Sequence, residues 1–200
     1  MKKTLSFIIL TFMSSQSMAE EGTEVSIFGG YRAGGELENT DTGNNASFGE
    51  TNSYGVIIGT DYGARHVMEF LYSYQKTDLT DTGSIPNSKL LNLDIEYFQL
   101  GGSQIWDGEK TDKFFGGTLG AIHLSPNNSA LSSKTRLSMS FGGGMVYKFT
   151  ENIGLRLELR AYLSSLGDSS AFCGPNNQCV VVGDGFMTQV DANAGVRFRF

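Results

Sequence analysis

The sequence contains little of several features that define common protein classes. No apolar run approaches the roughly 20 residues that a membrane-spanning helix needs, so the chain is not a helical membrane protein. Basic residues number 15 against 21 acidic ones, which argues against nucleic acid as a partner because that binding depends on basic patches. The length of 200 residues is enough for one domain and hardly for two.

The first residues have the parts of a secretory signal peptide. Lys2 and Lys3 precede a short apolar stretch, Leu5–Met13, and the small and polar residues after it end in Ser17-Met18-Ala19. A buried first helix is the alternative. We expect residues 1–19 to be cleaved and residues 20–200 to form a single domain, whose formal charge is then −8 because two lysines and no acid are removed.

The two cysteines predict a disulfide. Cys173 and Cys179 flank the turn-forming residues Gly-Pro-Asn-Asn-Gln. Cysteines this close in an exported protein are typical of a bond that staples a loop. A metal site is the rival interpretation, but no histidine and no third cysteine lies nearby.

Within residues 154–163, GLRLELRAYL, charge falls on every second residue from Arg156 to Arg160. Successive side chains of a strand point to opposite faces, so one face of this segment is apolar and the other is ionic. A helical period of 3.6 residues would scatter the leucines instead. This segment is therefore predicted to be a strand with one face against an oily environment.

Eight segments show the same period of two, and most have about the length of a tilted strand that crosses a bilayer. They cover residues 24–33, 48–61, 66–77, 89–101, 113–124, 135–149, 153–165 and 185–200. The connections alternate between long (34–47, 78–88, 125–134, 166–184) and short (62–65, 150–152), with 102–112 intermediate. All three prolines fall in long connections, where no ladder hydrogen bond is lost.

This pattern predicts an all-β fold, an eight-stranded antiparallel up-and-down transmembrane β-barrel with four long extracellular loops and short periplasmic turns. A soluble β-sandwich or a lipocalin-like barrel explains the alternation within each strand equally well. The sandwich does not explain the alternating connection lengths or the even number of strands. The lipocalin-like barrel would reverse the faces, with polar residues outside, and needs no aromatic residue at its end.

The polar faces of the strands predict an ion-pair network in the lumen. An outward arginine would cost roughly 2–4 kcal/mol at the bilayer midplane, and an unpaired buried ion costs several kcal/mol. Glycines at 30, 116, 120, 142 and 144 would leave space for long side chains, in a lumen too narrow for an aqueous channel. The predicted network consists of Arg32, Glu69, Asp94, Glu96, Arg156, Glu158, Arg160, Asp191 and Arg197.

The chain resembles the small outer-membrane β-barrel superfamily, the group around the OmpA transmembrane domain, OmpX and OmpW. The resemblance rests on the signal peptide, the eight amphipathic strands and the final Gly195-Val196-Arg197-Phe198-Arg199-Phe200. It implies a multi-pass protein of the Gram-negative outer membrane with both termini periplasmic. It also implies that Val196, Phe198 and Phe200 form the signal read by the barrel-assembly machinery.

The best candidate for catalysis is His123-Leu124-Ser125, because His and Ser two apart share a strand face. It faintly resembles the His-x-Ser-Asn of outer-membrane lipid A deacylases, but Pro126 stands where the Asn should be and no acid is evident nearby. His66, at a turn, is alone. We therefore predict no catalytic residues and no cofactor.

Charged residues near the predicted loops could meet lipopolysaccharide, although a solvated surface explains them as well. The expected role is non-enzymatic, in envelope structure or in surface interactions through the loops, with an unidentified surface ligand. A narrow pore for ions or small apolar solutes is the alternative, and a lipid A-modifying enzyme is a remote one. The charged residues are Glu36, Glu38, Asp41, Asp78 and Asp81, which could gather divalent cations, and Lys76, Lys89 and Lys134, which could meet phosphates.

Overall fold

In a computed structural model, the residues described are 22–38, 45–63, 65–81, 88–128, 131–166, 171–173, 179–181 and 185–200. The predicted signal peptide lies outside them. No helix in this part of the chain is long and apolar enough to cross a membrane. The long strands are β1 (Thr23–Gly34), β4 (Thr51–Asp61), β5 (His66–Asp81), β6 (Ser88–Trp106), β7 (Thr111–Pro126), β8 (Lys134–Lys148), β9 (Ile153–Ser165) and β12 (Phe186–Arg199).

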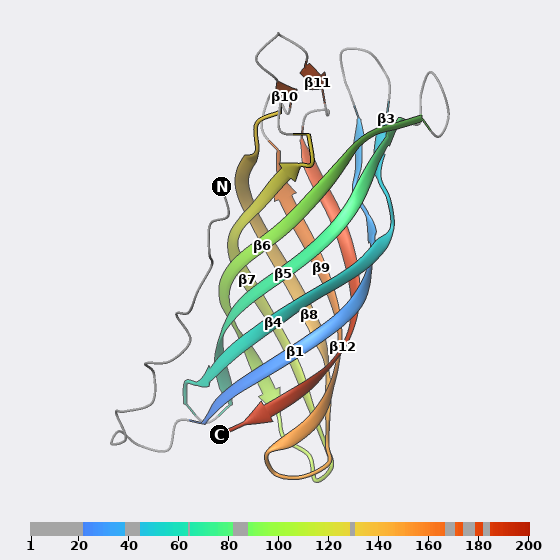
Figure 1. Ribbon diagram of the computed structural model, residues 1–200. Helices are drawn as coiled ribbons and strands as arrows, with labels where there is room; N and C mark the ends of the chain where they lie inside the picture. The colour runs from blue at the N-terminus through green and yellow to red at the C-terminus, as the bar shows by residue number, and fades with distance from the viewer. Residues whose placement is uncertain are drawn as a thin grey trace, which may run out of the picture.

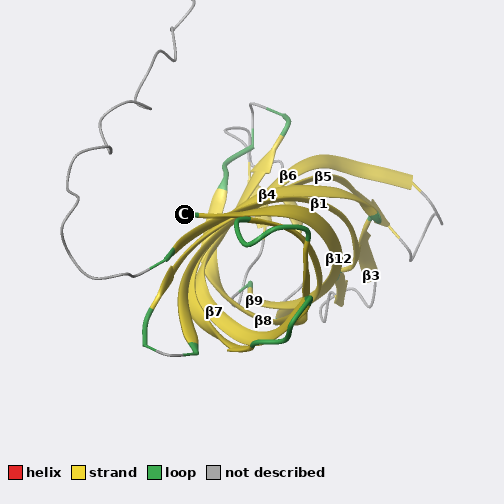
Figure 2. Ribbon diagram, turned by 90° about the horizontal axis from the view of Figure 1, so that it is seen from below, coloured by secondary structure: helices red, strands yellow, loops and turns green. Residues whose placement is uncertain are grey.

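These eight strands form a closed antiparallel barrel, as the sequence predicts. Each pairs with the strand that follows it around the ring, and β1 pairs with β12 to close the ring, with Ser26 opposite Arg197. The view along the barrel axis shows the ring (Figure 2). Four short strands lie beyond it: β2 (Glu36–Glu38), β3 (Asn45–Phe48), β10 (Ala171–Cys173) and β11 (Cys179–Val181).

The two ends of the barrel differ. Residues 62–65, 107–110 and 149–152 connect strands at one end, where β1 also begins and β12 also ends (Figure 1). We call this the turn end and the opposite end the loop end. The intermediate connection predicted at 102–112 is wrong, because β6 continues to Trp106 and β7 begins at Thr111. The long connection predicted at 78–88 is likewise shorter, since β5 and β6 extend into it.

Over most of its height the barrel is apolar outside and polar inside. Leu159 and Ile27 point outward and are 65% and 60% exposed, whereas Arg32 points inward and is fully buried. A soluble protein rarely exposes so large a continuous apolar surface. The outer wall is therefore suited to hydrocarbon, as the alternating pattern of residues 154–163 predicts.

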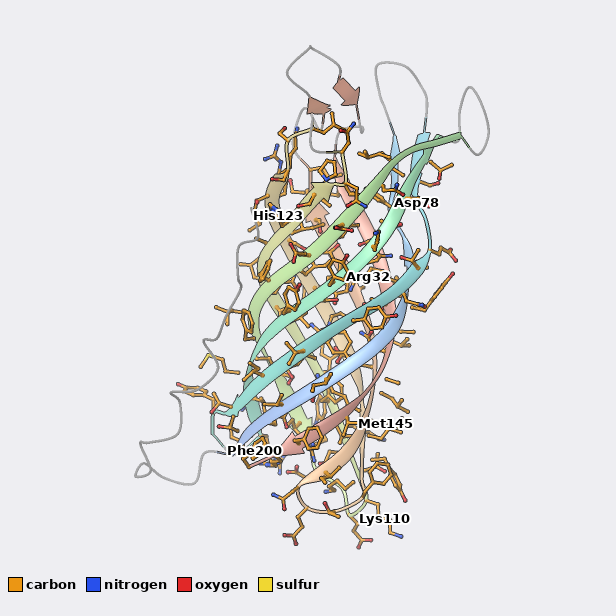
Figure 3. The ribbon with its side chains drawn as sticks, in the orientation of Figure 1. Arg32, Asp78, Lys110, His123, Met145 and Phe200 are labelled. Carbon is orange, nitrogen blue, oxygen red and sulfur yellow. The ribbon has the colours of Figure 1, made fainter. Side chains whose placement is uncertain are left out.

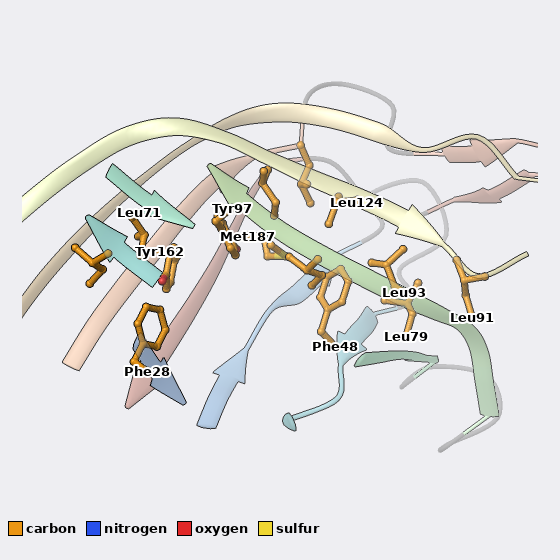
Figure 4. Packing of buried hydrophobic residues seen from close by; sticks show 14 residues of the cluster. Phe28, Phe48, Leu71, Leu79, Leu91, Leu93, Tyr97, Leu124, Tyr162 and Met187 are labelled. Carbon is orange, nitrogen blue, oxygen red and sulfur yellow. The ribbon is translucent and has the colours of Figure 1, made fainter. Parts of the chain in front are cut away.

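At the loop end this arrangement is reversed on β5, β6 and β7. An apolar plug fills the interior there (Figure 4). The outer face of the same strand segments carries polar side chains such as Lys76, Asn92 and Asp94. The plug consists of Phe48, Leu79, Leu91, Leu93, Ile95, Ile122, Leu124, Leu166 and Met187.

The reversal corrects the predicted orientation of residues 89–101, whose leucines were expected to face lipid. Leu93, Ile95 and Tyr97 are instead completely buried in the lumen. At 19 residues, β6 is about twice as long as the 9–11 residues that a transmembrane strand needs. Its first half therefore lies beyond the apolar band, where water favours polar residues outside and apolar residues inside.

This boundary predicts losses of stability of different size for an outward arginine on its two sides. Leu157→Arg, in the apolar band of β9, is expected to lower the free energy of unfolding by about 2–4 kcal/mol, whereas Asn92→Arg, in the polar part of β6, is expected to cost about 1 kcal/mol or less. Urea unfolding in phospholipid vesicles measures both. Equal losses would show that the apolar band extends over residue 92.

Candidate functional site

The lumen holds the densest set of charged side chains, and its middle layer is built around Glu158 on β9. Alternation places Arg156, Glu158 and Arg160 on the same inward face. Arg156 donates from Nε to Glu158 Oε2 at 2.9 Å, and Arg160 donates from Nε to Glu158 Oε1 at 2.7 Å. Because both carboxylate oxygens are bound by guanidinium groups, the row is held as a unit.

One ion pair crosses the lumen from wall to wall. Strands β5 and β9 lie on opposite sides of the eight-membered ring. Arg156 Nη2 on β9 lies 3.2 Å from Glu69 Oε1 on β5, and Ser103 on β6 donates to the same oxygen at 2.9 Å. These side chains therefore block the middle of the lumen.

A second layer surrounds Arg32, nearer the loop end (Figure 3). Arg32 on β1 pairs with Asp191 on β12 at 2.6 Å, and the other oxygen of Asp191 accepts a hydrogen bond from Ser53 at 2.8 Å. The guanidinium carbon of Arg32 also lies 4.9 Å and 4.6 Å from the ring centres of Tyr97 and Tyr162. Cation–π contacts of this kind are strong when the cation is desolvated.

A third layer, near the turn end, contains two acids that the sequence analysis missed. Glu24 lies 3.6 Å from both Arg156 and Arg197, and Asp112 lies 2.8 Å from Lys148. Glu24 is the first residue of its predicted segment, and Asp112 fell in the predicted connection 102–112. Their inward parity with Ser26 and Phe114 is the signal that could have found them.

The three layers are electrically balanced. Five cations meet five carboxylates, so none of these charges needs a counter-ion from solvent. The cations are Arg32, Arg156, Arg160, Arg197 and Lys148, and the carboxylates are Glu24, Glu69, Asp112, Glu158 and Asp191.

Glycine at position 142 makes room for the middle layer. A Cβ atom at Gly142 would lie 2.6 Å from Glu158 Oε1 and 3.1 Å from Arg160 Cζ. Any larger residue there would displace this ion pair.

The lumen position predicted for Asp94 and Glu96 is wrong. Both lie on the outer face of β6, where Tyr72 donates a hydrogen bond to Glu96 at 2.9 Å. The error has the same cause as the reversed leucines, because both residues belong to the part of β6 beyond the apolar band. The other seven residues of the predicted network all lie in the lumen and take part in its ion pairs.

His123 and Ser125 share the outer face of β7, and acids do lie next to them, contrary to the sequence analysis. Glu96 is the register partner of His123, and Asp94 is that of Ser125. These residues do not form a relay, however, because His123 Nδ1 bonds with Thr135 at 2.8 Å and Glu96 accepts a hydrogen bond from Tyr72. The arrangement lacks the acid–His bond that orients a catalytic base.

The structure describes only some of the charged residues predicted near the loops. Asp78 and Lys76 point outward from β5. Lys134 lies at the start of β8, where burial and then the nearby Arg136 guanidinium lower the pKa of its ammonium group. Among the residues that the structure describes, no three potential ligands cluster as a metal site requires. Asp41, and the side chains of Glu36, Glu38, Asp81 and Lys89, lie outside the described residues.

The remaining predicted residues lie at opposite ends of the barrel. Val196, Phe198 and Phe200 point outward at the turn-end part of β12 and after it, with 40%, 36% and 78% exposure. Cys173 and Cys179 are register partners in the β10–β11 hairpin. The side chains of the two cysteines lie outside the described residues, so their disulfide stays a prediction.

An apolar outer wall around a paired, ionic lumen defines an integral membrane β-barrel. The sequence model described as "Outer membrane protein beta-barrel domain" matches residues 5–200. The chain belongs to this family, and it is thus an outer-membrane barrel. No curated protein sequence matches it.

Solved structures of outer-membrane barrels share the fold. Neisserial surface protein A is 15% identical, with a TM-score of 0.62 over 90% of this chain and 100% of that one. The outer membrane protein AlkL, solved in lipid bilayers, is 14% identical, with a TM-score of 0.60 over 95% of both chains. OprG from Pseudomonas aeruginosa is 11% identical, with a TM-score of 0.59 over 91% of this chain and 96% of that one.

The layered lumen predicts a large penalty for removing its central cation. Arg156→Met is expected to lower the free energy of unfolding by about 3–5 kcal/mol, because Glu69 and Glu158 lose a buried partner. Arg199→Met, at the more exposed pair with Asp61, is the matched control and is expected to cost about 1 kcal/mol or less. Chemical unfolding in vesicles measures the two losses, and similar values would contradict a structural role for the middle layer.

Proposed function

We propose that this protein is a non-enzymatic barrel of the Gram-negative outer membrane that supports the envelope and interacts with its surroundings through the loop end. In this proposal the turn end and both termini face the periplasm. The long connections, the short strands β2, β3, β10 and β11, and the polar outer face of β5–β7 lie outside the cell.

The observation that carries this proposal is the closed lumen. The Arg156–Glu69 pair joins opposite walls, and the apolar plug fills the loop-end part of the interior. A cavity beside Glu24, Glu69 and Arg197 has a volume of about 10 Å³, close to the smallest volume that holds one water molecule. This packing favours a structural or surface role over the narrow pore.

Planar-bilayer recording distinguishes these two roles. We expect the purified wild-type protein to insert without discrete conductance steps. The double variant Glu69→Ala/Arg156→Ala removes the crossing pair and is expected to conduct, which verifies that the assay detects an opened lumen. Discrete steps from the wild-type protein would contradict the proposal and favour the pore.

The loop-end role predicts that shortening β10–β11 affects the cell surface and leaves the barrel folded. Replacement of residues 171–181 by a short Gly-Ser linker is expected to reduce binding of whole cells to an array of glycans and proteins, or to raise dye uptake, relative to complementation with the wild type. Lys110→Ala, an exposed change at the turn end, is the control. Wild-type behaviour in both assays would count against a role for this hairpin.

We also propose that Cys173 and Cys179 form a disulfide in that hairpin, because they are cross-strand partners and disulfides persist in exported proteins. A maleimide reagent is expected to label the unfolded wild-type protein only after reduction. Cys173→Ser leaves Cys179 without a partner and is expected to label without reduction. Labelling of the unreduced wild type would contradict the bond.

A further inference from the structure

A groove lies in the outer wall of the barrel near the turn end. It has a volume of about 710 Å³ and is lined by Tyr62, His66, Met68, Gly102 and Gln104, among others. This volume is within the range of about 300–1,000 Å³ that is typical of ligand clefts. The lining is mostly apolar, as expected of a wall that faces hydrocarbon.

The groove exists because the outer wall lacks side chains there. Gly102 on β6 points outward, and its neighbours across the sheet are Met68 on β5 and Gly117 on β7. Gly102 leaves the backbone of β6 bare between the ridges formed by neighbouring side chains, whereas the Phe141 ring covers Gly117 on the far side of β6. A Cβ atom at Gly102 would lie 2.9 Å from the carbonyl oxygen of Val67, so the close approach of β5 also requires glycine.

Unpaired basic side chains lie beside the groove. Arg65 precedes His66, and Lys113 on β7 is the register partner of Trp106 on β6. Arg65 and Lys113 are exposed, and neither forms an ion pair within the described parts of the chain. By contrast, Lys148 and Arg199, elsewhere at the turn end, pair with Asp112 and Asp61.

Amphipathic aromatic side chains lie at the same level of the barrel as the groove and the two basic residues. Tyr62 and Trp106 are 71% and 45% exposed. Tyrosine and tryptophan are enriched where a membrane protein passes from hydrocarbon to headgroups. The groove therefore begins at the headgroup level, beside free cations, and continues along the apolar wall.

We infer that this groove binds an anionic phospholipid, with one acyl chain over Gly102 and the phosphate against Arg65 and Lys113. A phosphate group complements the two unpaired cations, and the bare backbone provides the contact surface for the chain. If the turn end faces the periplasm, as given under Proposed function, the bound phospholipid lies in the periplasmic leaflet, so this location rests on the proposed function. The lipid preference itself does not, because it can be measured in symmetric vesicles.

Trp106 is the only tryptophan in the chain and lies two residues beyond Gln104, which lines the groove, so its fluorescence reports on lipid bound beside it. The protein is reconstituted in phosphatidylcholine vesicles that contain increasing fractions of brominated phosphatidylglycerol or brominated phosphatidylcholine, and quenching of Trp106 fluorescence is followed. We expect half-maximal quenching at a lower fraction of the anionic lipid. Equal quenching curves for the two lipids would overturn the inference.

Charge variants test the phosphate contacts. A Lys or Arg near an anionic surface contributes about 1 kcal/mol, or about fivefold in affinity. Arg65→Gln and Lys113→Gln are each expected to reduce the preference for phosphatidylglycerol about fivefold. Lys110→Gln makes the same change in charge at the tip of the turn (Figure 3) and is expected to leave the preference unchanged. An equal effect of Lys110→Gln would show general attraction rather than a site.

A variant that fills the groove separates acyl-chain binding from attraction to a charged rim. Gln104→Phe places a ring in the groove and is expected to weaken quenching by brominated phosphatidylglycerol, whereas Thr23→Phe, at the same end on β1, is not. Unchanged quenching in Gln104→Phe would refute the acyl-chain contact.

Added unbrominated lipopolysaccharide is expected not to relieve quenching, and relief would assign the groove to that lipid instead. Gel mobility before and after heating verifies that each variant is folded.

Discussion

The structure depends on the neutralisation of charge inside a narrow cylinder. Hydrocarbon outside the wall excludes ionic side chains from most of the outer face, so the strands turn them inward, where an unpaired ion costs several kcal/mol. Each charge must then find a partner inside the lumen, on its own strand or on another. The Arg156–Glu69 pair joins opposite walls, and the Arg32–Asp191 pair joins the first strand to the last. The same contacts that satisfy the charges also fill the lumen.

Strands β5, β6 and β7 belong to two environments along their length. Near the turn end their outward residues are apolar, as at Phe70 and Leu119. Their inward residues there include charged and polar side chains such as Glu69, among apolar ones such as Leu71. Near the loop end the plug replaces the ion pairs inside, and Lys76 and Asn92 face outward. The period of two is unchanged across the boundary. Only the solvent outside the wall differs, and the distribution of apolar residues reverses with it.

This reversal explains what could and could not be predicted from the sequence. The eight strands and two of the three tight turns follow from alternation and from short connections, whereas the turn at 107–110 was hidden in the longer connection predicted over 102–112. Alternation does not indicate, however, which face of a strand points into the barrel. A strand with leucines outward in lipid and a strand with leucines inward in water have the same pattern. Asp94 and Glu96 were therefore placed in the lumen with Glu158. An alternating segment much longer than a bilayer-spanning strand, such as β6 with 19 residues, is the signal that such a boundary is present.

The charge arrangement between β1 and β12 has a consequence for biogenesis. These strands come from opposite ends of the chain and meet last in any sequential assembly. A shift of two residues in the register between β1 and β12 would preserve both the inward–outward pattern and the backbone hydrogen bonds. Neither of these would therefore disfavour the shifted register. It would, however, bring Arg32 opposite Gln189 or Asn193 in place of Asp191, leaving two buried ions unmatched. The Arg32–Asp191 pair thus makes the correct register of β1 and β12 more stable than the registers shifted by two residues.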